Sequence, residues 1–90
     1  MRIVFDPAKD KLNLKRHGLS LAVATSLEWD DALVWVDERF TYDELRMLAL
    51  APGGDRLYYV AFVDRDDQRR VISLRFAERR EIKHYVENHP

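Results

Sequence analysis

The chain has 90 residues, of which 47% are hydrophobic and 34% are charged, and its formal net charge is −1. This length and composition predict a single domain over residues 1–90, and the near-zero total charge argues against tight nonspecific binding to duplex nucleic acid. Cysteine is absent, which excludes a disulfide framework and a thiolate metal site. No apolar run approaches the roughly 20 residues that span a bilayer, and no signal-peptide pattern opens the chain. We therefore expect a soluble, cytoplasmic protein.

Charge is distributed unevenly along the chain. Residues 1–18 carry five basic and two acidic side chains, whereas residues 19–47 carry two basic and seven acidic ones. A protein that binds nucleic acid gathers its cations on one face whatever its total charge. The segregation permits such a face without establishing it.

The N-terminal segment predicts a strand followed by a helix. Met1–Phe5 is rich in β-branched and aromatic residues, which favour a strand. Asp6 is suited to cap a helix that has Pro7 in its first turn, and Gly18 is suited to end it after about His17.

One side of this helix carries a polar stripe. Lys9, Asn13, Arg16 and His17 recur at i, i+4, i+7 and i+8, so they share a side. These groups are able to contact phosphate. The alternative is a solvated helix face whose terminal histidine interacts with the helix dipole.

The middle of the chain predicts one short helix and three strands. Ser20 is a fair N-cap for a helix over residues 20–28, and Trp35 is expected in the core rather than as a platform for base stacking. Pro52-Gly53-Gly54-Asp55 predicts a hairpin, and the polar residues 37–43 and 64–69 predict a loop and a turn. The strands are expected at Ala32–Val36, Glu44–Ala51 and Arg56–Val63, the last at the sheet centre.

The C-terminal segment combines two periodicities. From Arg70 to Phe76 the pattern has a period of two, with Arg70, Ile72, Leu74 and Phe76 on one face and Val71, Ser73 and Arg75 on the other. Arg75 stands in a mostly apolar strand, where a charge must be paired, solvated or bound to an anion such as phosphate. The helix that follows is expected to present a single face made by Ile82, Tyr85, Val86 and His89.

The predicted order β-α-α-β-β-β-β-α gives an α+β fold. It consists of an antiparallel β-meander sheet with two N-terminal helices and one C-terminal helix. The helices are expected to pack on the apolar face of the sheet. The opposite face would then carry the arginines of the strands.

Most familiar enzyme motifs are missing. The sequence holds no nucleophile elbow, P-loop or dinucleotide fingerprint, and His17, His84 and His89 lack metal-ligand spacing, so no metal site and no cofactor are expected. What remains is a set of Arg and Lys residues, one histidine at a helix end and a few carboxylates. This inventory suits RNA cleavage without metal, because the 2′-hydroxyl is the nucleophile and the protein need only position the backbone, move protons and stabilise charge.

Two blocks resemble the BrnT-type toxins. The first is Phe5-Asp6-x-x-Lys9-x-x-x-Asn13-x-x-Arg16-His17-Gly18-Leu19, and the second is Arg70-Val71-Ile72-Ser73-x-Arg75-x-Ala77 with the Arg79, Glu81 and Tyr85 that follow. Glu44-x-Arg46 and the Gly53-Gly54 hairpin fall between them in the same order as in that family. The family is similar to RelE-like ribonuclease toxins, so the resemblance implies a RelE-like fold and a bacterial toxin that stops translation by cutting RNA.

The resemblance also implies site residues and partners. It implicates His17, Arg46, Arg75 and Arg79 in catalysis and Phe5, Lys9 and Arg70 in RNA binding. Glu44 is a candidate base, and the alternative for it is a surface pair with Arg46. The implied partners are an RNA substrate and a BrnA-like ribbon-helix-helix antitoxin, expected in a 2:2 heterotetramer that binds operator DNA through the antitoxin, with no membrane involved.

Two classes of function follow. The first is a metal-independent endoribonuclease toxin. The second is a non-catalytic binding subunit of an antitoxin–DNA autoregulatory complex. Growth arrest caused by this chain alone fits only the first.

Overall fold

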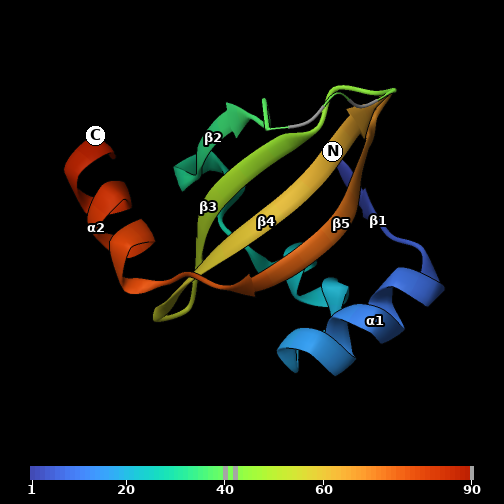
Figure 1. Ribbon diagram of the computed structural model, residues 1–90, viewed down its shortest axis with the longest axis horizontal. Helices are drawn as coiled ribbons and strands as arrows, with labels where there is room; N and C mark the ends of the chain where they lie inside the picture. Colours follow the sequence, from blue (N-terminus) through green and yellow to red (C-terminus); the bar gives the residue numbers. More distant parts are fainter. Residues whose placement is uncertain (40, 42, 90) are drawn as a thin grey trace.

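The computed structural model describes residues 1–39, 41 and 43–89 and shows an α+β fold around one five-stranded sheet (Figure 1). Two α-helices and two short 3₁₀ helices accompany the sheet. In chain order the elements are β1 (Arg2–Val4), α1 (Pro7–His17), η1 (Leu21–Ser26), η2 (Trp29–Asp31), β2 (Leu33–Val36), β3 (Met47–Gly53), β4 (Arg56–Arg65), β5 (Gln68–Phe76) and α2 (Arg79–Asn88).

The sheet is mixed, which corrects the prediction of an antiparallel meander. Its strand order is β1-β5-β4-β3-β2. The strands β2 to β5 form the expected antiparallel meander with β4 at the centre, but β1 pairs in parallel with the start of β5. Residue patterns show that a strand exists, whereas they carry no information about which edge a first strand joins.

Local signals at the first helix and the hairpin are confirmed. The Asp6 carboxylate accepts a hydrogen bond from the Ala8 backbone N–H at 2.8 Å, and Gly18 ends α1 in the left-handed conformation at φ 71°. At the hairpin Gly53 pairs with Arg56, and Gly54 has φ 59°. These features depend on neighbours in sequence, so the sequence specifies them directly.

The second expected helix, over residues 20–28, is wrong in kind and length. The chain forms the six-residue 3₁₀ helix η1, capped by the Ser20 side chain. The Thr25 and Ser26 hydroxyls donate to backbone carbonyl groups three residues earlier, at 2.7 and 2.9 Å. Such bonds compete with α-helical pairing and favour the tighter turn.

The core lies between η1 and one face of the sheet, here called the core face. The fully buried side chains come from η1, β3, β4 and β5, and they include Leu21, Ala49, Phe62, Val71 and Leu74. Successive residues of a strand point to opposite faces, so Tyr59, Ala61 and Val63 of β4 lie on the other side, here called the open face.

A β-bulge overturns the predicted faces of the last strand. Ala61 pairs with Ser73 but Phe62 pairs with Val71, so Ile72 is an extra residue in β5. The slip places Val71 and Leu74 together in the core, although strict alternation separated them. Arg69 also lies on the core face, with its guanidinium 4.4 Å from the Phe62 ring centroid, so the strand arginines are not confined to the open face.

The arrangement of the α-helices also differs from the expectation that all helices cover one apolar face. In Figure 1, α1 lies at the lower right beside β5, whereas α2 stands to the left of β3. On α2, Ile82 and Val86 are 45% and 70% exposed, so the expected apolar face of this helix is not buried. The Tyr85 hydroxyl donates to the Asp31 backbone carbonyl at 2.7 Å and ties the helix to η2.

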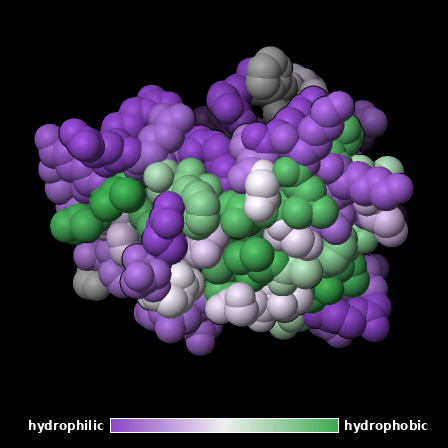
Figure 2. Space-filling view, turned by 90° about the horizontal axis from the view of Figure 1, so that it is seen from below, coloured by the Kyte–Doolittle hydropathy of each residue, from purple (hydrophilic) through white to green (hydrophobic). Residues whose placement is uncertain are grey.

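Large apolar side chains remain on the surface. Figure 2 shows hydrophobic side chains running across the face seen from below, beneath a hydrophilic upper rim. The exposed large apolar residues are Met1, Leu12, Leu14, Val34, Val36, Leu45, Phe76, Ile82 and Val86. In the part of the chain that the structure describes, no helix has the length and apolar content needed to cross a membrane.

Candidate nucleic-acid interface

Asn13 fixes α1 against the open edge of β5. Its side-chain amide donates to the backbone carbonyl groups of Leu19 and Leu74, at 2.9 and 2.7 Å, and its Oδ1 accepts from the Leu74 N–H at 3.0 Å. The strand β1 pairs only with residues 68–70 of β5, so Asn13 serves as the hydrogen-bonding partner further along this edge. The predicted polar stripe therefore divides, because Asn13 is 4% exposed and has a structural contact in place of a phosphate contact.

The rest of the stripe lines a groove between α1 and the sheet. One pocket of about 240 Å³ is lined by Lys9, Arg16 and His17 of α1, by Arg46 before β3, and by Ile72 and Ser73 of β5. A neighbouring pocket of about 460 Å³ shares Lys9, Arg46 and Ile72 with it and adds Arg70. The structure thus brings together Lys9, His17, Arg46 and Arg70, which stand far apart in the sequence, in what we call the cationic groove.

The charge of the groove is highest next to His17. The smaller pocket has the cations Lys9, Arg16 and Arg46 in its lining and no carboxylate. The larger pocket balances Lys9, Arg46 and Arg70 with carboxylates of Asp6, Asp43 and Glu44. An anion is therefore best accommodated at the His17 end of the groove.

Glu44 already bridges two arginines. Its carboxylate contacts Arg65 at 3.0 Å and Arg70 at 3.1 Å, and all three side chains are partly or largely exposed. The predicted strand 44–51 begins three residues later, at Met47, so Glu44 and Arg46 precede the ladder. Engagement of Glu44 with two cations weakens its candidacy as a base, because a base must be open to the proton it removes.

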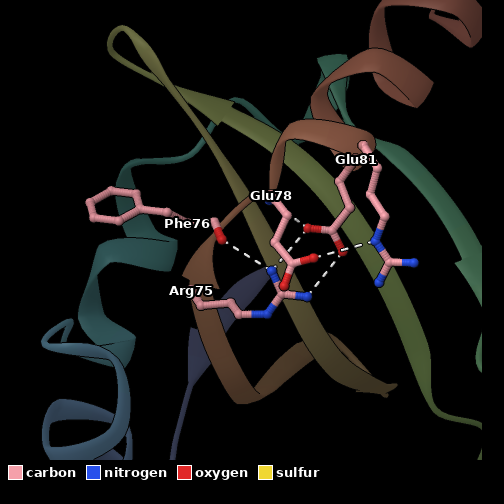
Figure 3. A network of polar contacts seen from close by, with 5 residues as sticks. Arg75, Phe76, Glu78 and Glu81 are labelled. Atoms are coloured by element: carbon pink, nitrogen blue, oxygen red, sulfur yellow. Dashed lines mark hydrogen bonds and ion pairs between the residues drawn. The ribbon is translucent and has the colours of Figure 1, made fainter.

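Arg75 lies outside this groove and has a carboxylate partner. In Figure 3 its guanidinium faces Glu81 in the first turn of α2, with Nη1–Oε1 and Nη2–Oε2 distances of 2.9 and 3.0 Å. Nη1 also donates to the Phe76 carbonyl at 3.1 Å, and the guanidinium carbon lies 4.2 Å from the Tyr59 ring centroid. Of the three alternatives that the sequence left open for this charge, the structure shows the first, pairing with a carboxylate.

The Arg75–Glu81 pair shifts both pKa values. The hydrogen bonds to Glu81 raise the pKa of Arg75. Burial by itself would raise the pKa of the Glu81 carboxyl, but the hydrogen bonds from Arg75 and from the Glu78 backbone N–H outweigh burial and lower it. Both charges are therefore held in place, and Glu81 joins the cap of α2 to β5.

The remaining predicted residues are dispersed. Arg79 is the exposed first residue of α2, and Phe5 packs against the edge of the core. Met47, the residue after Arg46, pairs with Phe62 of β4, whereas Arg75 pairs with Tyr59, so three residues of β4, about 10 Å of strand, separate the two positions. The structure consequently does not place Arg75 and Arg79 beside His17 and Arg46.

A third pocket of about 740 Å³ lies between α2 and the open face of the sheet. Its lining includes Trp35 and Tyr59, the cross-strand neighbours of Leu48 and Leu50 on β3, and His84 of α2. The Trp35 ring lies 6.3 Å from Tyr59 and 6.3 Å from His84, at steep angles of 64° and 80°. Trp35 was expected in the core, but its position in β2 places it on the open face.

Sequence reasoning missed this pocket. It placed Arg16 in the polar stripe with Lys9 and His17, although the family resemblance did not include Arg16 among the site residues. The pocket had no comparable signal, since its rings come from β2, β4 and α2. Among residues 1–39, 41 and 43–89, no group of three or more His, Cys, Asp or Glu side chains is arranged to hold a metal ion.

Comparison with known proteins identifies one family. The model of a family described as the ribonuclease toxin BrnT of type II toxin-antitoxin systems matches residues 5–81. That range covers α1, the four strands β2 to β5 and the first turn of α2, and it leaves out β1. A search of curated proteins found no match.

Proposed function

The chain belongs to the BrnT family of ribonuclease toxins of type II toxin-antitoxin systems, and we propose that it is a metal-independent endoribonuclease that inhibits translation in the cytoplasm. The proposal rests on one observation: His17 ends a helix beside three cations in a pocket that no carboxylate lines. An imidazole able to accept or donate a proton, placed beside clustered positive charge, is what cleavage by an internal 2′-hydroxyl requires.

The chemistry assigns a role to each groove residue. The 2′-oxygen attacks the adjacent phosphorus, the bond to the 5′-oxygen breaks, and the products are a 2′,3′-cyclic phosphate and a 5′-hydroxyl. His17 moves a proton to or from one of these oxygens. Arg46 stabilises the extra charge on the phosphorane through its planar fork of donors, while Lys9 and Arg70 bind neighbouring phosphates.

Arg75 and Arg79 are proposed to bind RNA where it passes the start of α2. A carboxylate and a phosphate present similar bidentate acceptors, so Arg75 is able to exchange Glu81 for a phosphate without losing its anionic partner. Arg79 adds an exposed cation beside it. Phe5 stays a predicted RNA contact through the part of its ring that the core leaves uncovered.

The test is cleavage of a defined RNA in the presence of a chelator. We expect full activity in chelator, cyclic phosphate and 5′-hydroxyl ends, and no cleavage where the attacking hydroxyl is replaced by hydrogen. His17→Ala and Arg46→Ala should each lower the rate by about 10²–10³. The matched controls are His89→Ala at the C-cap of α2 and Lys83→Ala on that helix, which remove an imidazole and a cation outside the groove and should leave the rate unchanged.

Three results would contradict this proposal. Activity that vanishes in chelator and returns with a divalent ion would exclude the metal-free route. Folded His17→Ala and Arg46→Ala proteins with full activity would remove the groove from the site. Absence of any cleavage or growth arrest by the wild-type chain alone would favour the non-catalytic subunit of an antitoxin–DNA complex.

The partner of a type II toxin is its antitoxin. We propose a BrnA-like ribbon-helix-helix antitoxin, in a 2:2 heterotetramer that binds operator DNA through the antitoxin. The exposed edge of the sheet supports a contact with the antitoxin there. The strand β2 forms this edge, and its side chains Val34 and Val36 are 42% and 37% exposed. Co-purification from the native operon should yield the complex, with slowed amide exchange in β2. Isolation of free monomer would count against it.

A further inference from the structure

We propose that the pocket between α2 and the open face, lined by Trp35, Tyr59 and His84, binds one nucleobase of the RNA whose phosphate lies in the cationic groove. This inference rests on the proposed function, because it assigns a second part of the same substrate. The volume of the pocket, about 740 Å³, lies within the range of known ligand pockets.

The walls of the pocket suit a flat ring. Trp35, Tyr59 and His84 come from β2, β4 and α2, and the floor between the two strands is made by Leu48 and Leu50, which are 3% and 1% exposed. Trp35 meets each of the other rings edge to face. A ring met edge to face by its neighbour keeps a face that this neighbour does not cover. Since the Arg75 guanidinium already lies over the Tyr59 ring at 4.2 Å, we take Trp35 as the ring on which the base stacks.

The charges of the pocket favour a neutral group over a phosphate. Its lining holds the carboxylates of Asp37, Glu38 and Glu81 against the guanidinium groups of Arg39 and Arg80. The Asp37 carboxylate is buried and binds Arg39 at 2.8 and 3.0 Å. The anionic phosphodiester of RNA would meet a lining with more carboxylates than guanidinium groups. A base would meet aromatic rings, with donors and acceptors available for its edge.

The pocket continues the cationic groove along β3. Arg46 lines the groove, and Leu48 and Leu50, at the next two positions on the same face of the sheet, line the pocket. Two residues of strand span about 7 Å, so adjoining parts of one RNA chain reach both places.

The first test observes binding without cleavage. The two tryptophans give separate indole N–H signals in a proton–nitrogen correlation spectrum, assigned with Trp35→Phe. Trp29 packs edge to face on Phe62 of the core, so it is an internal control. Each of the four nucleoside monophosphates should shift the Trp35 signal with about millimolar affinity and leave Trp29 unmoved, whereas ribose 5-phosphate should shift neither.

The second test measures cleavage and establishes RNA as the source of the base. An abasic nucleotide beside the scissile phosphate should lower kcat/KM by about 5- to 100-fold, the range expected for one stacked base. His84→Ala should raise KM with little change in kcat. His89→Ala, which removes a ring from the same helix outside the pocket, should change neither.

The outcomes separate the two proposals. Cleavage of RNA by wild type with no Trp35 shift from any nucleotide, or an equal shift from ribose 5-phosphate, overturns the base pocket and leaves the ribonuclease proposal standing. A Trp35 shift in a protein that does not cut RNA supports the pocket and overturns the ribonuclease proposal. Full activity of both the abasic substrate and His84→Ala overturns the pocket, and protection of Trp35 by the antitoxin alone would then assign the pocket to that partner.

Discussion

Removal of the Asn13 side chain should destabilise the fold far more than an ordinary polar substitution. Asn13→Ala deletes three hydrogen bonds and leaves the Leu74 N–H, the Leu74 carbonyl and the Leu19 carbonyl without their partner. An unsatisfied buried group costs about 1–3 kcal/mol, and water entering at the strand edge offsets part of that cost. We therefore expect a loss of about 3 kcal/mol, which lowers the melting temperature by roughly 12–24 °C for a domain of this size.

Thermal and denaturant unfolding, followed by circular dichroism, measure this effect. Asn88→Ala, at an exposed amide near the end of α2, is the matched control and should cost less than about 0.5 kcal/mol. Asn13→Asp keeps an acceptor for the Leu74 N–H but turns a carboxylate toward two carbonyl oxygens, so it should be destabilised at neutral pH and recover as acid protonates it. An Asn13→Ala protein as stable as wild type would refute the idea that this amide joins α1 to β5.

Two further predictions concern stability. Arg75→Ala and Glu81→Ala should each lower the free energy of unfolding by about 1–3 kcal/mol. In a double-mutant cycle the double variant should lose less than the sum of the two single losses, and additive losses would disprove the interaction. Because folding lowers the pKa of Glu81, its ionised carboxylate stabilises the fold above the unfolded-state pKa of about 4.3, and this stabilisation is lost as the pH falls through the folded-state pKa. The stability of Glu81→Gln should therefore fall less steeply with acid below about pH 4 than that of wild type. Gly53→Ala places a methyl group 2.7 Å from Leu27 Cδ2 and should cost about 1–3 kcal/mol in denaturant unfolding. Gly54→Asn, at a position with open space and φ 59°, should cost less, and equal costs would exclude the clash as the cause.

Elements that depend on short-range chemistry were predictable from the sequence. The cap at Asp6, the end of α1 at Gly18 and the hairpin at Gly54 each involve residues a few positions apart. Their backbone angles and hydrogen bonds follow from side-chain type alone. The antiparallel strands β3, β4 and β5 belong to the same class, because two-residue turns between them fix their pairing, whereas residues 37–46 separate β2 from β3.

Features set by long-range contacts were not predictable. The bulge at Ile72 depends on how β5 meets β4, and strict alternation assigned Val71 to the wrong face. The parallel pairing of β1 with β5 joins residues about 66 positions apart, and no periodicity encodes it. The exposure of Val86 on α2 is also a tertiary property, since the helical pattern of apolar residues is the same whether or not a partner covers it.

Sequence spacing predicted only part of the candidate site. Lys9, Arg16 and His17 were grouped correctly because one helix carries them, and Arg46 joins them through the fold. The resemblance implicated Arg75 in catalysis together with His17 and Arg46, but in the structure Glu81 holds it at bidentate distances of 2.9 and 3.0 Å. A cation near the core is expensive unless an anion compensates it, and the carboxylate supplies that anion when RNA is absent. In the proposed exchange an RNA phosphate would give Arg75 another bidentate anion, and the Glu81 carboxylate would keep only its hydrogen bond from the Glu78 backbone N–H, so the release of Glu81 opposes RNA binding at Arg75.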